Sequence, residues 1–181
     1  MNPQNTLNLP WPFCLGEGPL WAILDAASIP GLLGLFQQSQ TPQLCLYTGS
    51  LNADLASAAP YIARIDQPSP LADRLFLELW DRHPGIYFFA DADLHALRRH
   101  FRQFTIVYAP GAKPVYFRFY DPRVLRTYLP TCSTPQLRRF FGPVRRFLCE
   151  DQKPATSTIL SFTSNALSID RLPNPRPGSA A

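Results

Sequence analysis

Two aspartates separated by one residue are the sharpest candidate for chemistry in this sequence. Asp91-Ala92-Asp93 directly follows the apolar run at 86–89. Metal-dependent glycosyltransferases place such a pair after a strand, where its carboxylates hold a divalent cation on a nucleotide-sugar. The alternative is that Asp91 or Asp93 caps a helix starting at Leu94, accepting hydrogen bonds from unpaired backbone N–H groups. We favour the cap, because no phosphate-binding loop accompanies the pair.

Other signatures of catalysis are absent from the sequence. It contains no H-E-x-x-H, G-x-S-x-G, Walker or G-x-G-x-x-G motif. The four cysteines, at 14, 45, 132 and 149, lack zinc-ligand spacing, and we expect them to be small buried residues in a reducing cytosol. A Cys–His nucleophile pair stays open, because such partners meet only in the fold. We expect no catalytic residues, no metal and no cofactor.

The stretch F-R-F-Y-D-P-R-V-L at 117–125 is the most distinctive in the chain. We expect Arg118, which stands among aromatic residues, to pair with a carboxylate and lock neighbouring strand ends; the candidates are Asp91, Asp93 and Asp121. The alternative is a pocket for an acidic residue of a partner. Asp121 before Pro122 predicts a helix cap followed by the first helical residue. We assign an architectural role to Asp91, Asp93, Arg118, Tyr120, Asp121, Pro122 and Arg123.

The pattern of apolar residues predicts the elements that position these side chains. Short apolar runs predict strands at Leu20–Leu24, Leu44–Tyr47, Tyr61–Ile65, Ile86–Phe89, Thr105–Tyr108, Val115–Phe119 and Arg146–Leu148. Helical periodicity predicts helices at Ile29–Gln38, Leu71–Arg82, Leu94–Gln103, Arg123–Tyr128 and Pro135–Phe141. We expect an α/β (α+β) fold, in which a central mixed β-sheet of six or seven short, buried strands is flanked by helices in one compact lobe.

Two of the predicted helices are informative. In the helix at 94–103, an apolar stripe lies opposite a basic side formed by His95, Arg98, Arg99 and Arg102. The helix at 71–82 is apolar over about half of its circumference, which is wider than a surface helix needs. It is therefore either buried or in contact with a partner, and we favour burial.

Length and composition predict a single folded domain. The chain has 181 residues, of which 46% are hydrophobic and 17% charged. We expect an irregular N-terminal arm at 1–18 pinned by Trp11 and Phe13, a compact domain at 19–151, and a Pro-rich, flexible C-terminal tail at 152–181. The net charge is +4, but the basic residues are scattered among acidic ones, which argues against nucleic-acid binding. No membrane segment or leader is evident, so we expect a cytoplasmic protein.

Several blocks of the sequence, taken in order, resemble one known family. They are Trp21–Ala27, Cys45–Tyr47, Ala58–Tyr61, Asp91–Leu94, Leu97–His100, Phe117–Leu125, Leu129–Thr131 and Phe140–Val144. In order and spacing they resemble the domain of unknown function 4123 over about residues 19–151. The Arg-Phe-Tyr-Asp-Pro-Arg block at 118–123 is the most specific part of the resemblance.

The resemblance implies a non-enzymatic adaptor, or effector chaperone, of the bacterial type VI secretion system. Such a protein binds a toxic effector in the cytoplasm and helps load it onto the VgrG or PAAR spike. The implied partners are the cognate effector and a VgrG or PAAR protein, without nucleic acid or membrane. The alternative function is a metal-dependent glycosyltransferase-like enzyme using Asp91-Ala92-Asp93.

Arginine and aromatic residues supply much of the affinity in protein interfaces. We therefore expect the effector to contact two groups of residues: Arg98, Arg99 and Arg102, and Arg138, Arg139, Phe141, Arg145 and Arg146. The alternative is that each group is an ordinary solvated face, since arginine is common on protein surfaces.

Overall fold

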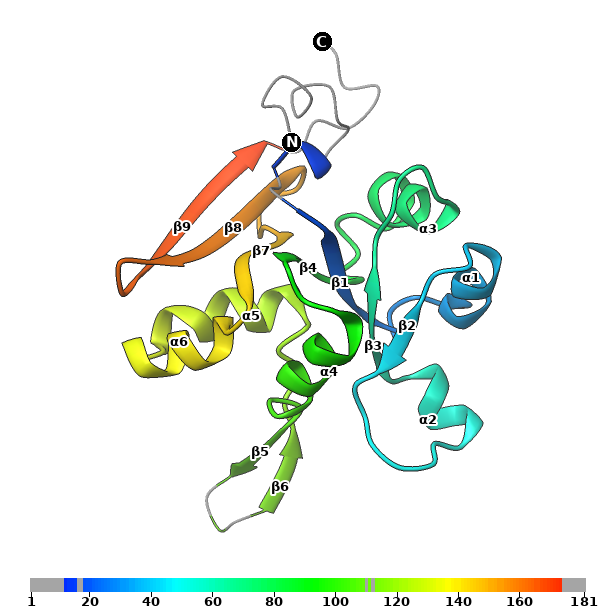
Figure 1. Ribbon diagram of the computed structural model, residues 1–181, viewed down its shortest axis with the longest axis horizontal. Helices are drawn as coiled ribbons and strands as arrows, with labels where there is room; N and C mark the ends of the chain where they lie inside the picture. The colour runs from blue at the N-terminus through cyan, green and yellow to red at the C-terminus, as the bar shows by residue number, and fades with distance from the viewer. Residues whose placement is uncertain (1–11, 16–17, 110, 112, 174–181) are drawn as a thin grey trace.

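The computed structural model describes residues 12–15, 18–109, 111 and 113–173. Its centre is a seven-stranded sheet (Figure 1). The strand order is β2-β3-β1-β4-β7-β8-β9, with bounds β1 Leu20–Asp25, β2 Gln43–Cys45, β3 Pro60–Arg64, β4 Gly85–Ala90, β7 Val144–Glu150, β8 Thr156–Thr163 and β9 Ala166–Pro173. The expected fold class and strand number are confirmed. The sheet is antiparallel and not mixed, because no crossover returns the chain parallel to a neighbouring strand.

Both faces of the central strands are buried, which explains their unbroken apolar sequences. In β1, Leu20, Ala22 and Leu24 pack into one core with α1 and α3, whereas Trp21 and Ile23 pack into another with α4, α5 and α6. The helices are α1 Leu32–Gln38, α2 Ala53–Ser57, α3 Pro70–Asp73, α4 Leu94–Arg102, α5 Pro122–Tyr128 and α6 Thr134–Phe141, with short 3-10 turns at Phe13–Leu15 and Leu129–Thr131. Because successive side chains of a strand point to opposite faces, three layers result.

The apolar helix predicted at 71–82 is part of the core. It begins as α3 and continues as a π-helical turn, η3 (Arg74–Glu78). Its apolar side chains are buried, apart from Leu77, which is 58% exposed on the outer side. The wide apolar surface is therefore covered by the protein itself, as favoured from the sequence. No helix among the described residues has the length and apolar character needed to cross a membrane.

The prediction of a flexible tail at 152–181 was wrong for its described part. β8 and β9 form a hairpin that extends the sheet beyond β7. Leu160 of β8 is fully buried and pairs with Phe147 of β7. Residues 174–181 lie outside the described part of the chain.

Local chemistry explains why this hairpin forms despite the nearby prolines. The β8 sequence, T-S-T-I-L-S-F-T, is rich in β-branched residues, which favour extended backbone. Ser164 and Asn165 form the two-residue turn, and both have positive φ angles, as tight hairpin turns require. Prolines flank the hairpin but are absent from the interior of β8 and from the turn, so the proline content of the segment as a whole obscured this signal.

At the N-terminus, the described part of the predicted arm is held against the core. Phe13 packs edge-on against Phe76, with ring centroids 5.9 Å apart. This contact agrees with the expected anchoring by Phe13. Trp11, the other expected anchor, lies outside the described residues.

Two predicted strands do not belong to the central sheet. They form β5 (Ile106–Ala109) and β6 (Lys113–Tyr116), a separate hairpin that projects from the body of the molecule (Figure 1). The expectation that such short apolar strands are buried was wrong here, because a two-stranded hairpin outside the layers has no helix to cover it. Phe117 and Phe119, predicted within the second strand, follow β6 in the connection to α5.

We expect Leu160→Ala to lower the free energy of unfolding by about 2–5 kcal/mol, because it leaves a cavity against Phe147. Urea denaturation followed by circular dichroism measures this change. The control is Ser168→Ala on exposed β9, which should shift stability by less than about 0.5 kcal/mol. Equal stability of both variants and the parent would show that β8 lies outside the cooperative core.

Candidate functional site

The two aspartates that follow β4 are engaged within the protein. Asp93 is the N-cap of α4: its Oδ1 accepts the Ala96 N–H at 2.8 Å, and this hydrogen bond holds the pKa of Asp93 below its usual value. Asp91 forms an ion pair with Arg145. Within the described ranges, no group of three or more His, Cys, Asp or Glu side chains is arranged to hold a metal ion. Asp93 therefore has the capping role favoured from the sequence.

The buried carboxylate of Asp25, at the end of β1, is the partner of Arg118. Asp25 is 2% exposed, and it accepts hydrogen bonds from Ser28 Oγ at 2.9 Å and from Ala27 N–H at 3.2 Å. Arg118 donates to the same carboxylate and lies 6.0 Å from the centroid of the Tyr120 ring. The sequence prediction of the partner was wrong: it named Asp91, Asp93 and Asp121. Arg118 is an internal lock, joining the chain after β6 to the end of β1.

Tyr120 and Asp121 fix the chain just after this ion pair. Tyr120 is buried, and its hydroxyl lies 3.4 Å from the hydroxyl of Tyr47. Asp121 caps α5 by accepting the Arg123 N–H at 2.9 Å, and Pro122 is the first helical residue, as predicted. Burial opposes ionisation of Asp121, but the hydrogen bonds from Arg123 hold its pKa below the usual value. The base of the β5–β6 hairpin is thus tied both to the sheet and to α5.

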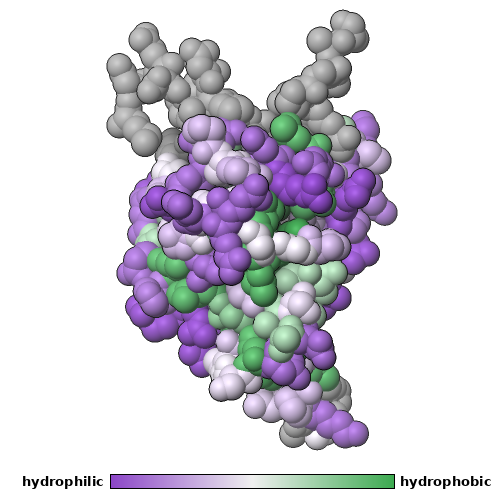
Figure 2. Space-filling model, turned by 90° about the vertical axis from the view of Figure 1, so that its right-hand side faces the viewer, coloured by the Kyte–Doolittle hydropathy of each residue, from purple (hydrophilic) through white to green (hydrophobic). Residues whose placement is uncertain are grey.

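The β5–β6 hairpin presents apolar side chains to solvent on both of its faces. It carries five of the nine exposed large hydrophobic residues of the described chain: Ile106 46%, Val107 39%, Tyr108 74%, Val115 43% and Tyr116 61%. Ile106 pairs with Tyr116 and Val107 with Val115, so each pair shares one face. In Figure 2, apolar surface continues from the body of the molecule onto the lower projection. Exposed apolar side chains concentrated in this way are typical of interaction sites.

A small groove lies where the hairpin meets the body. Its volume is about 210 Å³, and apolar Leu51, Leu55, Ile106 and Tyr116 line it together with polar residues such as Thr48 and Thr105. Tyr116 also packs against Tyr47 at the end of β2, with ring centroids 4.9 Å apart. Arg102 is the one charged residue among the described residues that line the groove.

The basic side predicted on α4 divides into an anchor and two exposed cations. Arg98 is half-buried and donates from Nε to the Cys45 carbonyl at 2.6 Å and from Nη2 to the Tyr47 carbonyl at 3.2 Å. It therefore ties α4 to the end of β2. Arg99 and Arg102 are exposed, and their guanidinium groups form no hydrogen bond or ion pair with other described residues. Arg102 follows Arg98 by one helical turn, which brings it to the groove.

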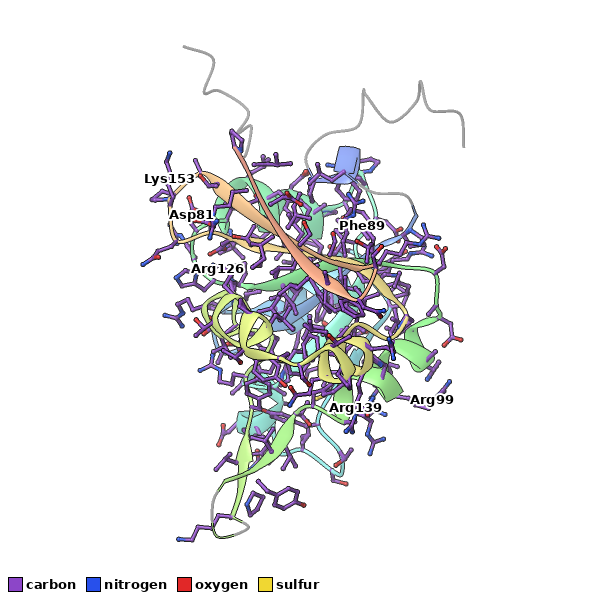
Figure 3. The ribbon with its side chains drawn as sticks, turned by 90° about the vertical axis from the view of Figure 1, so that its left-hand side faces the viewer. Asp81, Phe89, Arg99, Arg126, Arg139 and Lys153 are labelled. Carbon is purple, nitrogen blue, oxygen red and sulfur yellow. The ribbon has the colours of Figure 1, made fainter. Side chains whose placement is uncertain are left out.

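The second predicted basic group lies partly on α6. Arg138 donates to Asn165 Oδ1 at 2.7 Å, and Arg139 donates to Gln103 Oε1 at 3.0 Å. Both side chains are exposed, and Figure 3 shows Arg139 and Arg99 projecting outward on the same side of the molecule. Arg138 and Arg139 are accessible, but each already donates to a side chain of the fold.

The other members of this group are an exposed but paired arginine, a half-buried arginine and a buried phenylalanine. Arg145 pairs with Asp91, and half-buried Arg146 donates to the Leu15 carbonyl at 3.0 Å. Phe141 is 3% exposed and packs against Phe147. The prediction that Phe141 contacts the effector was wrong, because the inner side of α6 faces the core of the domain.

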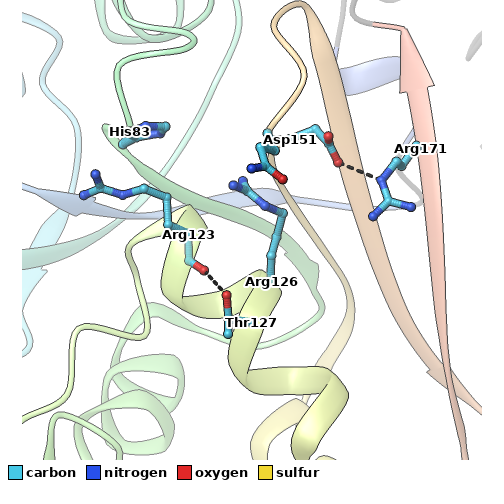
Figure 4. A pocket seen from close by; sticks show the side chains of 7 residues that line it. His83, Arg123, Arg126, Thr127, Asp151 and Arg171 are labelled. Atoms are coloured by element: carbon cyan, nitrogen blue, oxygen red, sulfur yellow. Dashed lines mark hydrogen bonds and ion pairs between the residues drawn. The ribbon is translucent and has the colours of Figure 1, made fainter.

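A second, polar depression lies beside α5 (Figure 4). Its volume is about 560 Å³, and it is lined by His83, Arg123, Arg126, Thr127, Asp151, Gln152 and Arg171. Beside it, buried Glu150 accepts a hydrogen bond from the His83 backbone N–H and lies 2.7 Å from its Nδ1, and burial raises the pKa of Glu150. Arg171 donates to Asp151 at 2.9 Å, and Arg126 donates to the Glu150 carbonyl. These cations have partners within the protein, in contrast to Arg102.

Sequence reasoning missed helix α2 and the exposure of the hairpin. α2 is short, and its signal was Asn52, whose side chain caps it by accepting the Leu55 N–H at 2.8 Å. For the hairpin, the signal was the P-G-A-K sequence at 110–113 between two apolar runs, with no helical segment between them. Runs joined so closely pair with each other.

A family model described as Domain of unknown function (DUF4123) matches residues 20–139. The matched segment extends from β1 to α6 and includes the hairpin, the groove and the Arg118–Asp25 lock. No curated protein and no solved structure matches the chain.

We expect Asp93→Ala to lower the melting temperature by a few degrees in buffer containing EDTA, because the first turn of α4 loses its cap. Asp93→Asn should retain most of the stability, since asparagine caps helices equally well. Differential scanning fluorimetry measures both variants. The glycosyltransferase hypothesis makes the opposite prediction: manganese with a nucleotide-sugar would stabilise the parent protein, and Asp93→Asn would abolish that shift.

We expect Arg118→Ala to lower the free energy of unfolding by about 1–3 kcal/mol, because it leaves a buried acceptor without its charged partner. In an Asp25→Asn background the same change should cost less, since no buried charge is left unpaired. Urea denaturation of the four proteins gives the coupling between the two side chains. Additive effects would contradict the assignment of this pair as the lock.

Proposed function

This chain belongs to the family described as Domain of unknown function (DUF4123), and from that premise we propose that it is a non-enzymatic adaptor of the type VI secretion system. In this proposal it binds a toxic effector in the cytoplasm and helps load it onto a VgrG or PAAR spike protein. The effector and the spike protein are its partners, and it needs no cofactor.

The observation that carries the proposal is the exposed β5–β6 hairpin. The rest of the domain buries its apolar residues efficiently, yet the hairpin leaves large side chains such as Tyr108 and Tyr116 in water. Leaving such residues exposed is unfavourable unless a partner covers them. Tyrosine is also among the residues that contribute most to interface affinity. The hairpin therefore supports a protein-binding function.

The carboxylates also favour binding over catalysis. Asp93 caps a helix, Asp91 pairs with an arginine, and Asp25 and Asp121 accept hydrogen bonds from arginines. A general acid or base needs a carboxylate within reach of a substrate. The groups that first suggested chemistry are instead engaged in helix capping and ion pairs.

The proposal predicts a stable complex with an effector encoded beside this gene. Tagged chain and effector should co-elute in size-exclusion chromatography after co-expression, and the effector alone should be poorly soluble. Tyr108→Ser should weaken the complex at least about 10-fold, as loss of a central aromatic contact does.

The matched control is Ile169→Ser on β9, a strand residue that is 39% exposed and lies outside the hairpin. It should bind like the parent chain. Two soluble proteins that do not associate would contradict the proposed function.

A further inference from the structure

The groove beside the hairpin has the dimensions of a site for one side chain. Its volume of about 210 Å³ is below the roughly 300–1,000 Å³ typical of small-molecule and cofactor pockets. Its lining combines the apolar Leu51, Leu55, Ile106 and Tyr116 with the polar Thr48, Thr105 and Arg102. A large aliphatic or aromatic side chain therefore suits this space better than a free ligand does.

The charge at the groove is positive and not neutralised. Arg102 lines the groove and forms no ion pair among the described residues, and Arg98 anchors the preceding turn of α4 to the end of β2. No acidic residue is among the described lining residues. A guanidinium group binds carboxylates through directed, charge-assisted hydrogen bonds. An acidic group of the partner, next to its inserted apolar side chain, would therefore complement the charge of Arg102.

The hairpin adds a constraint on the shape of the partner. Its sheet contains β5 and β6 alone among the described strands, so each strand has an outer edge without a neighbouring strand. Open edges of this kind pair with extended peptide segments. An extended segment also exposes alternate side chains on one face, which allows a carboxylate to accompany an apolar residue along the groove.

From these observations we infer that the groove binds an extended, acidic segment of the partner protein. The segment inserts one large apolar side chain between Leu55 and Tyr116 and places a carboxylate on Arg102. This inference rests on the proposed function, because it gives the chemical character of the partner surface that the adaptor recognises.

A second copy of this chain is a poorer occupant of the groove. In a two-fold dimer the same patch faces itself. Arg102 and exposed Lys113 would then approach their own counterparts, in a chain whose net charge is already +4. Like charges brought together in this way oppose association, whereas an acidic segment is attracted.

The first test uses defined peptides and the isolated protein. Isotope-labelled chain is titrated with a peptide carrying a Phe-Ser-Glu core in a Ser-Gly context, in which Phe and Glu share one face of an extended backbone, and with the counterpart in which glutamine replaces glutamate. NMR shifts should be centred on Leu55, Arg102 and Tyr116, and the glutamine peptide should bind about five-fold more weakly. Arg102→Gln should remove this preference, and Arg99→Gln, the matched control on the same helix, should retain it. Equal affinity for both peptides, or no shifts at the groove, would overturn the inference.

The second test uses the effector complex and separates the two proposals. Leu55→Asp and Arg102→Glu should each weaken the complex about 10-fold or more, and Arg99→Glu should not. If the parent chain and both groove variants bind the effector equally well, the groove assignment is refuted and the adaptor function stands. If the groove binds the acidic peptide but no effector complex forms, the adaptor function is refuted and the groove assignment stands. A concentration-dependent dimer that dissociates in Ile106→Ser would assign the groove to a second copy of the chain.

Discussion

The negative charge of Asp25, buried at the end of β1, needs a charged partner and hydrogen bonds. The side chains that supply them fix the position of the surrounding segments. Removing an ionised group from water is costly unless it gains a charged partner and hydrogen bonds. Asp25 gains both, from Arg118 and from the turn that follows β1. Because Arg118 lies between β6 and α5, its ion pair brings that segment back to the centre of the sheet. The buried Tyr120 beside it adds a contact to Tyr47 at the end of β2. The hairpin therefore leaves the domain from a fixed base.

The distribution of surface charge also follows from the use of carboxylates inside the fold. Asp25, Asp93 and Asp121 accept hydrogen bonds within the fold, and Asp151 accepts one from Arg171. The cations left with exposed, unpaired groups include Arg102 on α4, beside the groove. The positive charge beside the groove is thus a consequence of the use of acidic side chains in caps and internal ion pairs. In the proposed adaptor, this charge would attract acidic partner segments.

Local signals in the sequence predicted local structure well, and long-range contacts poorly. The cap at Asp93, the start of α5 at Pro122 and the buried strand β1 follow from patterns of a few residues. The partner of Arg118 did not, because Asp25 lies 93 positions away and nothing in the spacing links the two. Apolar strand content predicted β5 and β6 but not their exposure, since burial depends on whether a helix covers them. The β8–β9 hairpin was missed because proline content outweighed strand propensity.

The position of β8 also has a consequence for the order of events during synthesis. Leu160 completes the core around Phe147, yet it lies well after the segment that forms the groove and the hairpin. Protein chains emerge from the ribosome starting at the N-terminus. The hairpin and the groove are therefore translated before the strand that completes this core. A nascent chain would therefore display its apolar hairpin on an incomplete domain until residues 156–173 have left the exit tunnel.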